Sequence, residues 1–228
     1  MTYHIDISDP PVVKVPIVDS AEPLVSVANH IELGPPPECP ATRDNYHFVR
    51  QGVLARLTLA QQSLPKGLRL RLYEGYRSPE FQRTLFAQQL AQVKITHPQL
   101  SFSERYQKAA QLVAPVETLT GEGLTPPHSS GGAVDIEIVD SSGKVIDFGM
   151  EIKDWAEVPA ALCATDAPGL STEAMQNRAL LISVMEEAGF VNYSREWWHF
   201  SFGDQYWAYM SNERQAHYGC AAQTGSFN

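Results

Sequence analysis

The 228-residue chain has few cysteines and no long apolar stretch. Its three cysteines, Cys39, Cys163 and Cys220, are far apart, odd in number and without CxxC spacing. They predict neither a disulfide framework nor a cysteine-type structural zinc site. No stretch approaches the ~18 consecutive apolar residues of a membrane helix, so we expect no membrane-spanning segment.

Positive charge is also scarce, with 17 Lys and Arg against 26 Asp and Glu, a formal net charge of −9. Such a chain repels nucleic acid and anionic membrane surfaces, so we expect a small or neutral partner. The first 20 residues have no basic start followed by an apolar core, so we expect no signal peptide and a cytoplasmic location. The sequence predicts no particular oligomeric state.

The first part of the chain is rich in proline, which disfavours long helices. These prolines are Pro10, Pro11, Pro16, Pro23, Pro35, Pro36, Pro37 and Pro40. We therefore predict a proline-rich N-terminal arm (residues 1–42) packed on a core domain (residues 43–228). The whole chain has the length of one compact domain.

Apolar residues at helical spacing predict the helices of the core domain. We expect helices at residues 46–62 and at about 103–113. A further helix should begin after the N-cap Ser78, and a long helix should end at Gly189. In the last of these helices the residues expected to face inward are Met175, Ala179, Ile182 and Met185.

Alternation of apolar with polar residues predicts strands at 68–74 and 133–139, and an aromatic strand follows at 196–202. Within 133–139, Asp135 and Glu137 point away from the three apolar side chains Val134, Ile136 and Ile138. The predicted fold is a compact α+β domain, in which helices flank a small, mostly antiparallel sheet.

Two pairs of residues could carry chemistry. His128 lies in a Gly/Ser/Pro-rich loop seven residues before Asp135, although for this pair alone a solvated strand carboxylate is the better interpretation of Asp135. Glu196 and His199 lie among aromatic residues, where burial is costly unless both groups are paired, hydrogen-bonded or metal-bound. An exposed Glu196 beside a hydrogen-bonded core histidine is the alternative.

Taken together, these residues predict one metal site. Two imidazoles and a carboxylate form a ligand set of catalytic zinc that leaves one position for a water. We expect one Zn²⁺ per chain on His128, Asp135 and His199, although iron(II) also suits these ligands. Glu196 would take the proton of the water. Arg77, at a strand-to-helix turn, would balance charge on the scissile carbonyl, unless it is an ordinary surface arginine.

The spacing of Glu196 and His199 makes a geometric prediction. Residues three apart leave a regular strand on opposite faces. For both side chains to reach one metal ion, the chain must bulge near Trp197 or the strand must begin after Glu196.

Four motifs now suggest a family. They are EGYR at 74–77, HSSGGAVD at 128–135, Asn177-Arg178 and EWWH at 196–199. In this order they resemble the D-alanyl-D-alanine dipeptidases, a family of zinc peptidases, from about residue 43 to the C-terminus. The resemblance implies a zinc dipeptidase catalytic domain at 43–228 that cleaves D-Ala-D-Ala, a precursor of peptidoglycan. It implies the same metal ligands, base and transition-state stabiliser: His128, Asp135, His199, Glu196 and Arg77.

The chain differs from this family at two positions that are associated with the substrate in the family. A family serine that is associated with the substrate carboxylate is replaced here by Pro126 and Pro127, which offer neither a hydroxyl nor an N–H. Thr125 and Ser129 are the candidates to replace it, with Ser130 as a third. Where the family tends to carry an aspartate that receives the substrate ammonium, this chain has Lys153 followed by Asp154, and Asp154 is the candidate for that role. Because of these two departures, the exact dipeptide stays open.

Two other functions stay open. A D,D- or L,D-carboxypeptidase would hydrolyse a peptidoglycan stem peptide in preference to the dipeptide, but such enzymes usually need export or a wall-binding module. A noncatalytic zinc-binding module would bind zinc without turnover, and it would need neither Glu196 nor Arg77.

Overall fold

The computed structural model describes residues 4–37 and 39–221. A five-stranded sheet lies at the centre of this part of the chain, in the order β2-β4-β5-β7-β6. The strands are β2 (Glu32–Leu33), β4 (Arg69–Glu74), β5 (Ala133–Val139), β7 (His199–Ser201) and β6 (Val191–Asn192). β2 pairs in parallel with β4, and the other pairs are antiparallel. The predicted α+β class is therefore confirmed.

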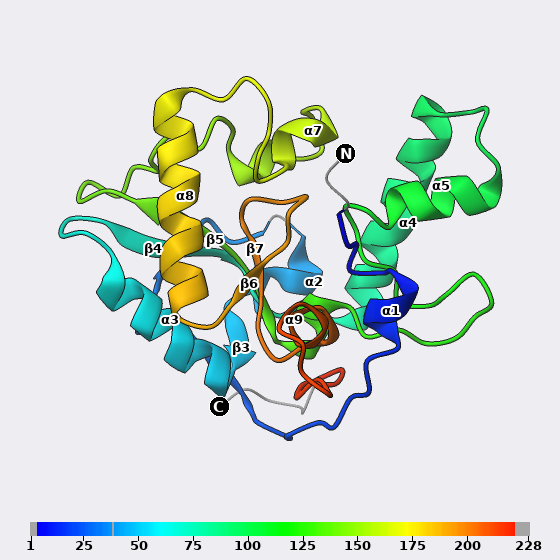
Figure 1. Ribbon diagram of the computed structural model, residues 1–228, viewed down its shortest axis with the longest axis horizontal. Helices are drawn as coiled ribbons and strands as arrows, with labels where there is room; N and C mark the ends of the chain where they lie inside the picture. The colour runs from blue at the N-terminus through cyan, green and yellow to red at the C-terminus, as the bar shows by residue number, and fades with distance from the viewer. Residues whose placement is uncertain (1–3, 38, 222–228) are drawn as a thin grey trace.

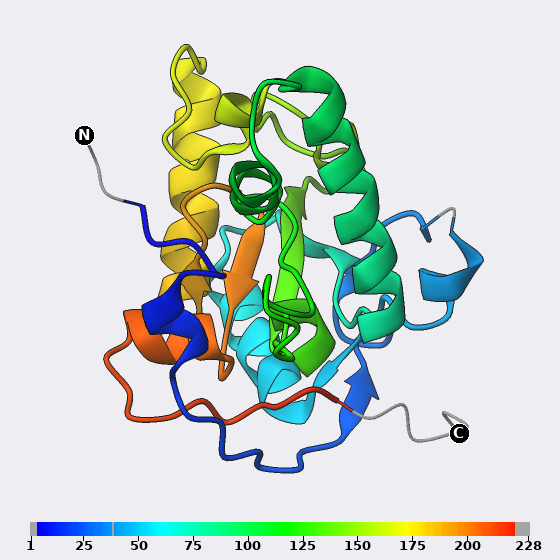
Figure 2. The same cartoon turned by 90° about the vertical axis from the view of Figure 1, so that its right-hand side faces the viewer.

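Helices lie on different sides of this sheet (Figures 1 and 2). α3 (Gln51–Ser63) and α8 (Thr172–Glu187) contact each other, while α4 (Pro79–Thr96) and α5 (Phe102–Ala109) form a separate pair. The short helices are α6 (Pro127–Ser130), η1 (Ile152–Asp154), α7 (Ala160–Cys163) and α9 (Gln205–Met210). Among the described residues no helix is long and apolar enough to cross a membrane.

The main core lies between α3, α8 and the sheet. Leu57 of α3, Leu181 of α8 and Ile136 of β5 are fully buried there, together with Trp197 and Phe200. Burial of this apolar surface fixes the strands that carry the polar residues described below.

The described part of the proline-rich segment forms short elements, as its composition predicts. These are α1 (Pro10–Val13), β1 (Leu24–Ser26), β2 and α2 (Pro40–Arg43). β1 pairs with β3 (Phe48–Arg50), and Val27 and Ile31 belong to the main core. The segment is thus built into the fold, while a domain boundary at residue 42 stays a prediction.

Two local predictions are wrong. The helix expected from residue 46 begins at Gln51, because the residues before it pair with β1 as β3. In α8, Met185 is buried as predicted. Met175 is 51% exposed and Ala179 is exposed, because the buried face runs through Arg178 and Leu181 before it reaches Met185. The guanidinium of Arg178 donates to the backbone carbonyls of residues 148, 162 and 164, so an arginine occupies the inner face of this helix.

Candidate active site

Three neighbouring strands place polar side chains next to one another. Asp135 of β5 pairs with His199 of β7 on one side and with Glu74 of β4 on the other. A register shift between Leu72 and Glu74 brings Glu74, rather than Tyr73, opposite Asp135. Bulges of this kind re-aim side chains near functional sites. Asp135 is only 6% exposed, so it is not the solvated strand carboxylate that the sequence alone allowed.

His128 approaches the same place from α6. Its Nδ1 lies 2.7 Å from the carbonyl oxygen of Gly75. Because a carbonyl only accepts hydrogen bonds, Nδ1 is the donor, and Nε2 is the nitrogen available to a metal ion. Nε2 lies 3.4 Å from Asp135 Oδ1. The hydrogen bond to Gly75 therefore turns the free nitrogen of His128 toward Asp135.

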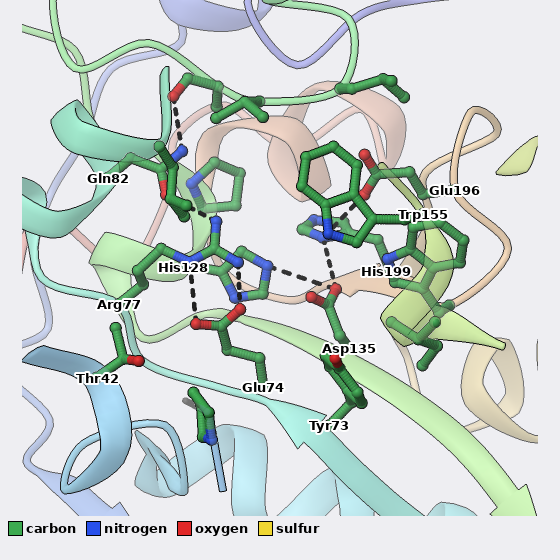
Figure 3. A pocket seen from close by; sticks show the side chains of 18 of the residues that line it. Thr42, Tyr73, Glu74, Arg77, Gln82, His128, Asp135, Trp155, Glu196 and His199 are labelled. Carbon is green, nitrogen blue, oxygen red and sulfur yellow. Dashed lines mark hydrogen bonds and ion pairs between the residues drawn. The ribbon is translucent and has the colours of Figure 1, made fainter. Parts of the chain in front are cut away.

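The resulting cluster has the donors and spacing of a metal site (Figure 3). The ligand atoms of His128, Asp135 and His199 lie within 4.8 Å of one another, and all three residues are buried. His199 Nδ1 is 3.2 Å from Asp135 Oδ1. Tetrahedral zinc ligands, with bonds of about 2.0–2.2 Å, lie about 3.3–3.6 Å apart. The donor set and the two separations from Asp135 Oδ1 therefore fit a zinc ion.

The protonation states also suit a metal. Burial acts to raise the pKa of Asp135, but the two histidines lower that pKa well below its usual range. Burial lowers the pKa of His199, although its hydrogen bond to Asp135 opposes the shift. A carboxylate and a neutral imidazole are the forms that bind metal ions.

Glu196 lies beside this cluster because the chain turns before β7. The strand begins at His199, whose N–H donates to the Glu196 carbonyl at 3.2 Å. The prediction of a strand that starts after Glu196 is confirmed. The turn leaves Glu196 Oε2 3.9 Å from His199 Nδ1. Burial and the charge of Asp135 raise the pKa of Glu196 well above its usual value, while Arg77 lowers it.

Arg77 is held by two residues that the sequence reasoning missed. Its Nε donates to Glu74 Oε1 at 3.1 Å, its Nη2 also donates to Glu74, and its Nη1 donates to Gln82 Oε1 at 2.9 Å. Gln82 in turn donates to the carbonyl of Ala114 at 2.7 Å. Burial acts to lower the pKa of Arg77, but Glu74, Asp135 and Glu196 raise it, so the guanidinium stays charged. The spacing of Glu74 and Arg77 within EGYR was the available signal.

A cavity of about 720 Å³ opens beside the cluster. It is lined by the metal-site residues, by Glu196 and Arg77, and by Asp154 and Tyr73. Burial and nearby carboxylates raise the pKa of Tyr73 to about 12, so its phenol stays protonated. Thr125 and Ser129 do not line the cavity, and the buried Ser129 hydroxyl has no partner among the described residues. Their predicted substrate role stays a prediction.

A model of the D-Ala-D-Ala dipeptidase family of peptidases matches residues 48–218 of the chain. The chain belongs to this family. It is 30% identical over 225 residues to a D-alanyl-D-alanine dipeptidase of Synechocystis sp., covering 90% of this chain and 91% of that protein. It is 37% identical over 73 residues to a D-alanyl-D-alanine dipeptidase of Escherichia coli K12, covering 32% and 36%. A solved structure of VanYB in complex with D-alanine-D-alanine gives a TM-score of 0.45 at 13% identity, covering 90% and 94%.

Membership confirms the family that the four motifs suggested, and the chain is accordingly a hydrolase of the metallopeptidase class. The matched region contains Arg77, His128, Asp135, Glu196 and His199. It begins after the proline-rich segment, although Pro35, Pro36, Pro37 and Thr42 of that segment also line the cavity.

Proposed function

We propose that the chain hydrolyses the D-alanyl-D-alanine dipeptide with one zinc ion held by His128, Asp135 and His199. The observation that carries this proposal is the convergence of three buried donor atoms, with separations of 3.2 and 3.4 Å from Asp135 Oδ1. The substrate follows from the family and from the Synechocystis relative, a D-alanyl-D-alanine dipeptidase.

Glu196 moves the protons of this hydrolysis. When bound, zinc at such a site polarises the scissile carbonyl and lowers the pKa of a water. Glu196 takes a proton from the attacking water and passes it to the amine of the departing alanine. Its buried position beside His199, with a pKa raised well above the usual value by burial and by the charge of Asp135, supports this role.

Arg77 stabilises the negative charge that grows on the carbonyl oxygen. Three of its five N–H groups are used by Glu74 and Gln82, which fix the plane of the guanidinium and leave two for the substrate. A charged donor that is held in place before the reaction needs little reorganisation in the transition state.

The two ends of the dipeptide need partners as well. Asp154 lines the cavity and is the proposed partner of the substrate ammonium. Thr125 or Ser129 is proposed for the substrate carboxylate, with weaker support because neither lines the cavity. A cytoplasmic location and a role in peptidoglycan turnover stay predictions.

An amine-release assay tests the function. D-Ala-D-Ala, L-Ala-L-Ala and a stem pentapeptide are compared for the wild type, for the zinc-depleted and zinc-restored protein, and for Glu196→Gln. We expect preference for D-Ala-D-Ala, loss of activity on zinc removal and recovery on zinc addition. General acid–base catalysis is worth about 10²- to 10⁴-fold, so Glu196→Gln should lose that much kcat, or about 3–5 kcal/mol, while keeping zinc.

The matched control is Glu173→Gln, because Glu173 is an exposed residue of α8 that does not line the cavity. It should keep full activity. Nearly full activity of Glu196→Gln would show that the base assignment is wrong. Faster hydrolysis of the pentapeptide would indicate the carboxypeptidase instead, and bound zinc without turnover would indicate a noncatalytic module.

A further inference from the structure

His199 has a second ring nitrogen that the proposed metal site does not use. Nδ1 faces Asp135, whereas Nε2 is buried without a hydrogen-bond partner among the described residues. Two further buried oxygens of the described chain lack a partner on the same segment, Ser201 Oγ and Asp204 Oδ2. Metal-bound histidines almost always donate their other N–H to a carboxylate, a carbonyl or a water.

The chain places these three groups near one another. His199 and Ser201 are two residues apart on β7, so their side chains leave the same face. Asp204 follows in the next turn and is 1% exposed. Burial raises the pKa of Asp204, whereas the backbone N–H of Trp207, the Ser201 hydroxyl and the charges of the histidines lower it.

Only one of the two carboxylate oxygens of Asp204 has a hydrogen-bond partner among the described residues. It is the N-cap of α9, where Oδ1 accepts the N–H of Trp207 at 2.8 Å. A helix cap needs only this one oxygen, and asparagine or serine serves nearly as well in that position. The cap therefore does not explain the second carboxylate oxygen of Asp204, which is buried without a partner among the described residues.

We propose that Asp204 is a positioning residue for the metal site, which receives the Nε2–H of His199 through one buried water shared with Ser201. Buried waters typically make about three hydrogen bonds to polar groups that lack other partners, and these side chains supply three. Fixing the proton on Nε2 keeps the lone pair on Nδ1, directed at the metal. The inference rests on the proposed metal site, and it names the residue that holds the ligand His199 in the orientation needed to bind the metal.

Zinc affinity tests this inference without any substrate. Competition with a chromophoric chelator gives the affinity of the wild type, Asp204→Asn and the control Ser171→Ala, which removes the N-cap of α8 at an exposed position. Loss of such an outer partner typically costs about 10- to 100-fold in metal affinity, which we expect for Asp204→Asn. The cap oxygen remains, so the melting temperature of its zinc-free form should stay close to that of the wild type.

The control should show the opposite pattern, with a lower melting temperature and unchanged zinc affinity. Cobalt(II) substitution adds a second readout, because a changed visible spectrum in Asp204→Asn reports altered geometry at the metal. If Asp204→Asn does not fold, Asp204→Ser keeps the cap and carries the same expectation. Wild-type zinc affinity in the folded variant would overturn the proposal. Zinc binding by the wild type without dipeptide hydrolysis would contradict only the proposed function.

Discussion

Asp135 and Glu137 leave the same face of β5, but they have different partners. Asp135 contacts His128 and His199, whereas Glu137 accepts a hydrogen bond from Arg71 at 2.8 Å. Histidine contacts lower the pKa of Asp135, while burial raises the pKa of Glu137. The sequence identified both carboxylates but could not distinguish them by pattern, because their partners come from other helices and strands. The ligand set of catalytic zinc favoured Asp135, and the motif likeness implied the same residue.

Substitution of Arg77 distinguishes a role in stabilising the transition state from a role in binding the metal. Arg77→Ala should lower kcat by about 10²- to 10³-fold, the usual effect of losing one preorganised donor at the carbonyl oxygen, with unchanged zinc content. The measurement is kcat together with bound zinc per chain. Arg69→Ala is the control, since Arg69 pairs with Glu32 and does not line the cavity. Loss of zinc in Arg77→Ala would show that Arg77 supports the metal instead.

Among the elements, those with local signals were predicted well. The strand ending before Gly75, the Ser78 cap of α4 and the strand of residues 133–139 are all confirmed. β3 was missed because its residues pair with β1, more than 20 positions earlier in the chain. Part of the inner face of α8 was missed, although Met185 was predicted correctly. The buried guanidinium of Arg178 donates to backbone carbonyls, and a charged residue on the inner face interrupts the apolar pattern.

The observed face of α8 makes a stability prediction. Leu181→Ala should lower the free energy of unfolding by about 2–5 kcal/mol, because it leaves a cavity in the main core. Met175→Ala should change it by less than about 0.5 kcal/mol, because Met175 is exposed on the same helix. Urea unfolding of both variants measures this. Similar losses at the two positions would contradict the orientation of α8.

The start of α5 predicts a pH-dependent contribution. Ser101 and Glu104 form a capping box, and the Ser101 hydrogen bonds lower the pKa of Glu104. A lowered folded-state pKa adds stability above the ordinary glutamate pKa, and this is lost as pH falls through the folded value. Glu104→Gln should therefore lower the melting temperature slightly at pH 7 and hardly at all near pH 3. An equal difference at both pH values would show that the charge of Glu104 contributes nothing.

On the scale of the whole molecule, the proline-rich segment is part of both the core and the cavity. Val27 and Ile31 are buried in the main core, and Tyr46 donates to the carbonyl of Gly34. The sequence predicted a packed arm but could not place it, because proline content specifies extended chain and not the surface that it covers.

Removal of the first 42 residues should therefore lower the thermal midpoint strongly or abolish cooperative unfolding, since it exposes core surface. Circular dichroism measures this, and Val18→Ala is the control because Val18 is 55% exposed in the same segment. A truncated chain that melts like the full chain would show that the segment is dispensable for folding.

The metal itself gives the most direct test of the site. Anomalous diffraction at the zinc absorption edge, from crystals of the zinc-loaded protein, locates the ion without reference to activity. The account predicts one strong peak in contact with His128 Nε2, Asp135 and His199 Nδ1, beside Glu196. A peak bound elsewhere, or none at these residues in crystals of active protein, would contradict it.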